Sequence, residues 1–141
     1  MSLLERLTPA RWRRAPVVVE LDPEDPTLVL LVQAPDAARA DSAVLAEAAE
    51  DGVDLAAPLL VRHHLVGLPD PAAVDEAERL LAQDGYRVLP SPDGPPLAVL
   101  AVRTQVLTAL SASQERSRMA GLAQRLGGDV AGWDALGPPQ R

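Results

Sequence analysis

The sequence predicts an α+β fold, a ferredoxin-like antiparallel sheet with two helices on one face, preceded by a β-hairpin and one more helix. Three observations lead to this prediction. From residue 59 onward, apolar runs and helical patterns alternate in the order β-α-β-β-α-β. Most of these elements end at a glycine or proline signal. The chain has 141 residues, enough for one hydrophobic core but too few for two.

The first third of the chain predicts the hairpin and the extra helix. Two runs rich in valine and leucine, residues 17–21 and 27–32, flank the turn-forming segment Asp-Pro-Glu-Asp-Pro. Residues 37–50 then predict a helix that Asp36 caps and that Asp51-Gly52 end. We therefore expect an arm and hairpin over residues 1–35, the main domain over 36–135 and a loose tail over 136–141.

The first half of the main unit predicts a strand and a helix. Residues 59–66 have the length and bounds of a buried strand, although periodicity alone does not separate this leucine-containing run from a helix. Asp70-Pro71 is a strong helix start, because aspartate caps free N–H groups and proline suits the first helical position. This helix should run to about residue 84, with an Asp75–Arg79 pair on its wet side and Gly85 as a left-handed cap. Its inward residues should be Val74, Ala77, Leu80 and Leu81.

The second half predicts two strands, a helix and a last short strand. Residues 86–89 and 97–103 should be the strands, joined by a proline-rich segment too long for a tight hairpin turn. The helix should begin near Ser111, which with Gln114 fits a capping box. Residues 129–131 should add the last strand. The inward residues of this helix should be Met119, Leu122, Ala123 and Leu126.

Composition excludes several function classes. The chain has no cysteine, so disulfides, thiolate nucleophiles and iron–sulfur clusters are excluded. The formal net charge is −7, and residues 1–16 alone carry +3, which leaves −10 for the rest. Such a body repels polyanions, so direct nucleic-acid binding is not expected, whereas a basic protein partner is compatible. A signal peptide or membrane span is not recognisable, so we expect a cytoplasmic protein.

A series of short signals between residues 50 and 135 resembles one protein family. The segments are EDGVDLAAPLLVRHHL, DPAAVDEAERLLAQDGYRV and LAQRLGGDVAGWDAL. Their order is similar to that of the regulator of ribonuclease activity B family, whose members bind ribonuclease E and inhibit it. The resemblance covers roughly residues 41–135 and favours a strand for residues 59–66. The chain departs from the family pattern by about 35 extra residues before this region and by an end, GPPQR, that lacks a strongly acidic tail.

His63 and His64 are the first candidates for a site. Neighbouring residues of a strand point to opposite faces, so the two rings cannot converge on one metal ion. We expect His63 under the helices, as a hydrogen-bonded core residue. Arg62 and His64 should lie on the open face, where His64 is either structural or, with Arg62, a contact for a partner.

Acidic and aromatic residues supply the other candidates. Asp75, Glu76 and Glu78 form either a solvated helix surface or a docking surface for arginines of a partner. Trp133 is expected to fill the core beside the last strand. Trp12 lies among three arginines, and it is either a tether that folds back on the domain or an exposed anchor for a partner.

The sequence thus indicates a non-catalytic regulator that binds a protein, and the resemblance implies ribonuclease E as that protein. Phosphate loops, serine elbows, metal-spaced histidines and paired catalytic carboxylates are not recognisable, so we expect no catalytic residue, cofactor or metal. The alternative is a general interaction or dimerisation module whose sheet face is covered by its own hairpin or by a second subunit. An enzyme or metal protein that uses His63, His64 and nearby carboxylates is a third, weaker hypothesis.

Overall fold

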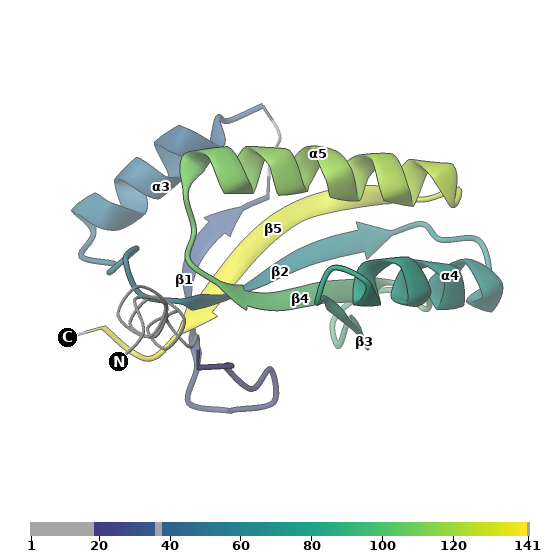
Figure 1. Cartoon of the computed structure of the whole chain (residues 1–141), viewed down its shortest axis with the longest axis horizontal. Helices are drawn as coiled ribbons and strands as arrows, with labels where there is room; N and C mark the ends of the chain where they lie inside the picture. Colours follow the sequence, from purple (N-terminus) through teal and green to yellow (C-terminus); the bar gives the residue numbers. More distant parts are fainter. Residues whose placement is uncertain (1–18, 36–37, 141) are drawn as a thin grey trace, which may run out of the picture.

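The computed structural model describes residues 19–35 and 38–140. In this part of the chain, a five-stranded antiparallel sheet carries three helices on one face (Figure 1). The predicted α+β class is confirmed. In chain order the elements are β1 (Val29–Ala34), α3 (Asp41–Glu50), β2 (Leu59–Val66), α4 (Pro71–Ala82), β3 (Arg87–Pro90), β4 (Val99–Gln105), α5 (Ala109–Arg125) and β5 (Asp129–Gly137).

The strand order in the sheet is β1-β5-β2-β4-β3, and every neighbouring pair is antiparallel. Strand β2, which has the predicted bounds, is the central strand between β5 and β4. Strands β1 and β3 form the two edges. The side of the sheet without helices is called the open face below.

The predicted N-terminal hairpin is wrong within the described residues. Residues 19–21 of its first run are not a strand, and residues 17 and 18 lie outside the described part of the chain. The second run does form a strand, β1, but β1 pairs with β5 at the far end of the sequence. Leu21 instead donates its backbone N–H to Thr104 Oγ1 of β4, 3.0 Å away. Residues 19–28 therefore cross the open face, and we call them the strap; Figure 1 shows them opposite the helices.

Two of the three helix starts differ from the prediction. Helix α4 begins as expected, with the Asp70 carboxylate accepting the N–H of Ala73. Helix α3 begins at Asp41 after Ala40, which offers no side-chain cap; Asp36 lies outside the described residues. Helix α5 begins two residues earlier than expected, because Thr108 rather than Ser111 is the cap and the two residues exchange side-chain hydrogen bonds.

The helix side of the sheet holds most of the core. Leu81, Met119 and Leu122 face inward as predicted, whereas Val74 and Leu80 are only partly buried. A second helix-side cluster joins α3 to β1 and surrounds Trp133, which confirms its expected core position. The open face is covered as well: Leu60, Leu100 and Val102 are buried there, with Leu21 and Leu28 of the strap packed against them.

Strand β5 is longer than the predicted residues 129–131 and reaches Gly137, so the loose tail begins later than expected. It contains a β-bulge, because His63 is opposite Trp133 but Leu65 is opposite Val130. Gly132 lies at the bulge with φ +99°, and a Cβ there would come within 2.3 Å of the Ala34 carbonyl oxygen. Only glycine fits this conformation without strain.

We predict that Leu81→Ala and Leu122→Ala each lower the free energy of unfolding by about 2–4 kcal/mol, because each removes a buried side chain from the core under α4 and α5. Leu110→Ala is the control, since Leu110 is 67% exposed and its truncation should change stability by less than about 0.5 kcal/mol. Urea denaturation of the three variants measures this. Equal midpoints would contradict the assigned helix faces.

Gly132→Ala should destabilise the protein by about 2 kcal/mol or more, because the new methyl group collides with backbone and the residue keeps a positive φ. Gly121→Ala should stabilise it by about 0.5–1 kcal/mol, since Gly121 is inside helix α5 and a Cβ there meets open space. Thermal unfolding of the two variants, followed by circular dichroism, compares them. A stabilised Gly132→Ala variant would show that the bulge is not required.

Candidate functional site

The two adjacent histidines lie on opposite faces of strand β2, as predicted. His63 is 2% exposed and faces the helices, whereas His64 is partly exposed on the open face. They cannot share a ligand. The hydrogen bond expected for His63 is missing at one ring nitrogen, because Nε2 is buried without a partner among the described residues.

His63 belongs to a polar cluster beneath α5. Its ring meets the Tyr86 ring edge to face, with centroids 6.1 Å apart. The Tyr86 hydroxyl and the Arg103 guanidinium both donate to Glu115, and Arg103 also stacks 4.2 Å above the Tyr86 ring. Burial lowers the pKa of His63 to about 4, although the Glu115 carboxylate opposes this shift. His63 is therefore a neutral core residue at physiological pH.

The open face carries a second polar cluster, centred on Asp134 of β5. The Arg62 guanidinium donates to its carboxylate twice, from Nε at 2.6 Å and from Nη2 at 2.9 Å. His64 Nε2 lies 2.8 Å from the same carboxylate. Burial raises the pKa of Asp134, but hydrogen bonds from His64 and Arg62 outweigh burial and hold this pKa below its ordinary value.

This geometry changes the interpretation of Arg62 and His64 as contacts for a partner. The two side chains do share the open face, as expected, but both are turned toward Asp134, whose side chain is 7% exposed. Bidentate pairing leaves Arg62 little free charge for a partner. Sequence reasoning missed Asp134 because it ended the last strand at residue 131. A signal was present, since an aspartate between Trp133 and Ala135 in an apolar run indicates a strand with one polar face.

The acidic residues of α4 lie on the helix side of the domain, away from Arg62 and His64. Asp75 and Glu78 are exposed. The partner of Arg79 is Glu76, at 2.6 Å, and not Asp75 as predicted. The structure therefore does not bring the α4 carboxylates together with Arg62 and His64. One of the three α4 carboxylates, Glu76, is already paired with Arg79. Trp12 lies outside the described residues.

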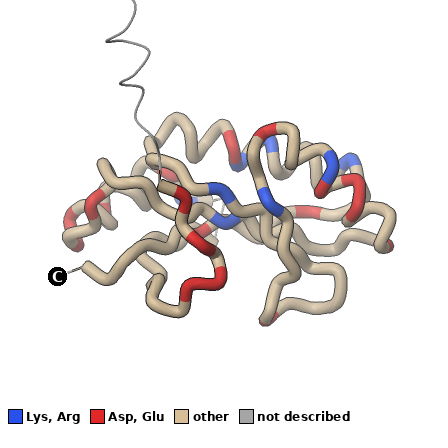
Figure 2. The backbone as a smooth tube through the Cα atoms, turned by 60° about the horizontal axis from the view of Figure 1, so that its bottom comes forward, with Lys and Arg blue, Asp and Glu red and all other residues tan. Residues whose placement is uncertain are grey.

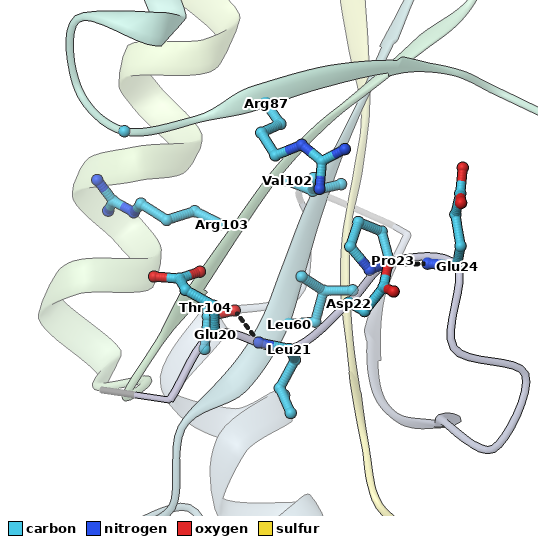
Figure 3. Close-up of a pocket in the computed structure, with 11 residues that line it drawn as sticks. Glu20, Leu21, Asp22, Pro23, Glu24, Leu60, Arg87, Val102, Arg103 and Thr104 are labelled. Atoms are coloured by element: carbon cyan, nitrogen blue, oxygen red, sulfur yellow. Dashed lines mark hydrogen bonds between the residues drawn. The ribbon is translucent and has the colours of Figure 1, made fainter. Parts of the chain in front are cut away.

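Two cavities lie on the open face, one lined by residues 102–104 toward the end of β4 and the other by residues 98–100 at its start. The larger, about 670 Å³, lies between the strap and the sheet and has Leu60 and Val102 in its lining. Figure 3 shows Arg87 extending over Val102 toward Pro23 of the strap, while Arg103 points away. The smaller cavity, about 250 Å³, is lined by Arg62, His64 and the loop that follows β3. Both are open depressions, with a mixed lining that suits contact with a polypeptide.

A buried carboxylate on the helix side ties three elements together. Asp41, the first residue of α3, accepts the indole N–H of Trp133 from β5 at 3.0 Å and pairs with Arg116 of α5. This cluster has a structural role, because its members are largely buried. Among the described residues, no three histidine, aspartate or glutamate side chains lie close enough to hold a metal ion.

These clusters lie on elements between α3 and β5. The same part of the chain matches a known family. The model of the family described as regulator of ribonuclease activity B, RraB, matches residues 38–135. The chain belongs to this family. A search of the curated proteins and a search of the solved structures found no match. The match of the family model confirms the predicted resemblance to RraB. In the described part of this RraB-family chain, no helix is long and apolar enough to cross a membrane.

His63 should make the protein sensitive to mild acid. Its pKa is about 4 in the folded state but about 6.5 when unfolded, so the unfolded state takes up a proton first. Stability is therefore present above pH 6.5 and is lost as the pH falls from 6.5 toward 4. We expect a loss of about 2 kcal/mol between pH 7.5 and pH 5.

His63→Gln should remove this pH-dependent loss, because glutamine does not titrate, whereas His64→Gln should retain it. Urea denaturation at the two pH values gives the four free energies of unfolding. The pH-dependent difference is the readout, since either variant can alter stability at pH 7.5. A wild-type slope in His63→Gln would contradict the assignment.

Proposed function

We propose that this RraB-family chain regulates ribonuclease E by binding it, as a non-catalytic cytoplasmic protein. The observation that carries the proposal is the family match, because it covers α3 to β5, the larger part of the described domain. The polar clusters are compatible with a binding role. Each charged group in them has a structural partner: Arg62 with Asp134, Arg103 with Glu115, and Arg116 with Asp41.

The fold supports a binding role by analogy. Strands β2 to β5 lie in the order β5-β2-β4-β3, with α4 and α5 on one face, and we identify this unit as ferredoxin-like. Domains of this kind commonly act through a sheet face, a helix face or an edge, and fold alone does not select the partner.

A second candidate is the general interaction or dimerisation module. One observation favours it: the strap covers part of the open face with Leu21 and Leu28. The alternative expected a hairpin or a second subunit in this position, and the strap is not a hairpin. A homodimer or an unrelated protein partner is then the alternative to the ribonuclease.

Inhibition of ribonuclease E by the chain should be stoichiometric. Titration at an enzyme concentration well above the dissociation constant should give an endpoint at a fixed molar ratio, because a binder does not turn over. Cleavage of a fluorogenic RNA measures it, with heat-denatured chain as the control. Activity that falls progressively at far lower ratios would indicate catalysis. A wild type that neither binds nor inhibits the ribonuclease would favour the interaction module.

The α4 docking surface stays a prediction. Reversal of Asp75, Glu76 and Glu78 to arginine should slow association with the ribonuclease and reduce its salt dependence, because rim charges act mainly on the association rate. Reversal of Asp129 and Asp93 is the control. Binding kinetics over a salt series measure this, with circular dichroism to confirm the fold. Unchanged kinetics would remove α4 from consideration and leave the open face around Arg62 and His64.

A further inference from the structure

The negative charge of the chain is concentrated in one part of it. Residues 19–54 contain ten aspartate and glutamate residues and one arginine, a net charge of −9, whereas residues 55–141 contain nine acidic residues and eight arginines, a net charge of −1. In the structure, residues 19–54 comprise the strap, β1 and α3. Figure 2 shows the acidic positions of the strap as a run of red down the middle of the view, on the face turned toward the reader.

Strand β1, at the centre of this acidic part, has one edge without a strand partner among the described residues. It pairs with β5 on one side and forms an end of the sheet on the other. An open edge offers backbone N–H and C=O groups to another chain, and proteins usually protect it with short strands, charges or proline. Strand β3, at the opposite end, is protected in this way, because it has four residues, begins with Arg87 and ends with Pro90.

Strand β1 lacks these protections. Its six residues, VLLVQA, include no charge and no proline. Val29 and Leu30 are 39% and 49% exposed, so the edge also presents apolar side chains. The strand precedes the residues that match the RraB family, which begin at 38. β1 therefore has an exposed apolar edge without the usual protections.

We propose that the open edge of β1 is the docking site for an extended, arginine-bearing segment of the ribonuclease, which adds to the sheet as a sixth strand. The inference rests on the proposed function and specifies the surface to which the ribonuclease binds. Main-chain hydrogen bonds to β1 supply affinity without sequence specificity, as in other cases of strand addition. Alternate side chains of the added strand would then project to the two faces of the sheet.

Carboxylates on both sides of the edge select the occupant. On the helix side, Glu47 and Asp51 of the α3 region line a cavity of about 140 Å³ with Leu31 and Val32 of β1. Glu47 pairs with Arg39, but the exposed Asp51 and Glu50 have no ion-pair partner among the described residues. On the open-face side, Glu24 and Asp25 of the strap precede β1 in the chain, and Glu24 lines the open-face cavity together with Leu60 and Val102. Arginines at neighbouring positions of an added strand point to opposite faces, so a segment with arginines at both odd and even positions meets the carboxylates of both faces.

The same comparison argues against α4 as the main docking surface. Glu76 is engaged by Arg79, and α4 belongs to the nearly neutral part of the chain. A second copy of this chain is a poorer occupant of the edge, because its own strap and α3 would bring further carboxylates to the carboxylates already there.

The edge variant for the test is Val29→Lys with Leu30→Lys, because both side chains are exposed and lysine is a natural edge protector. Its matched control is Val106→Lys with Leu110→Lys, at two other exposed apolar side chains away from β1. The charge variant neutralises Glu24, Glu50 and Asp51 as Gln, Gln and Asn, and its control changes the exposed Asp93 and Asp129 to Asn.

Three ligands are measured by fluorescence anisotropy: ribonuclease E, a labelled peptide in which pairs of arginine alternate with pairs of valine, and a peptide with glutamate in place of arginine. The paired arrangement places arginines on both faces of an added strand. We expect the ribonuclease and the arginine peptide to bind the wild type and the two controls alike. The edge variant should bind both at least about tenfold more weakly, and the charge variant should lose most of the salt dependence. Hydrogen exchange should slow at β1 amides in the complex.

Edge and control variants that bind the ribonuclease equally would overturn the inference. So would an effect confined to the charge control, or tight binding of the glutamate peptide. A wild-type dimer in sedimentation that becomes monomeric in the edge variant would assign the edge to a second copy and also overturn it. If the ribonuclease fails to bind the wild type while the arginine peptide still binds at the edge, the proposed function fails and the basic-segment site stands.

Discussion

Strand β2 is buried on both of its faces, and most other elements are placed by the need to cover it. Leu59, Val61 and Leu65 point toward the helices, and Leu60 points into the cluster beneath the strap; all four are 2% exposed or less. Helices α4 and α5 can cover only one face. The open face therefore needs another cover, and Leu21 and Leu28 of the strap supply part of it.

This two-sided burial also explains the polar clusters. A histidine or arginine on a doubly covered strand needs partners nearby, since unpaired buried polar groups are costly. Arg62 and His64 find Asp134 on the neighbouring strand, and Arg103 of β4 finds Glu115 on α5. Several charged groups of the chain thus stabilise its own fold. The charges available to a partner are mainly those of the strap and α3.

Sequence reasoning succeeded where local signals and burial agree. The bounds of β2, the Asp70 cap of α4, the left-handed Gly85 and the buried Trp133 all follow from nearby residues, and the structure contains each of them. The hairpin failed because residues 27–32 have the composition of a strand but composition does not identify the partner. β1 pairs with β5, about a hundred residues away along the chain, and strap residue Leu21 bonds to β4. Long-range pairing of this kind leaves no local trace in one sequence.

The candidate site was predicted only in part for the same reason. The opposite faces of His63 and His64 follow from the two-residue period of a strand. The Arg62–Asp134 pair could not be foreseen, because it depends on the register between β2 and a strand whose length was underestimated. The Glu76–Arg79 pair shows a smaller limit, since spacings of three and four residues are both compatible with a helix.

The bulge in β5 has a consequence for insertions and deletions. Val130 faces the helices, and strict alternation from there would turn Trp133 to the open face and Asp134 into the core. The extra residue at the bulge reverses these two orientations. The Trp133 indole therefore contacts Asp41, and the Asp134 carboxylate contacts Arg62. If the ladder became regular with all residues retained, the two environments would be exchanged, placing a charge in an apolar core and an indole beside a guanidinium. Deletion of one residue between Val130 and Trp133 would instead remove the bulge and keep both side chains on their present faces. At its present length, the segment therefore depends on the bulge conformation at Gly132 to keep the indole and the carboxylate on their faces.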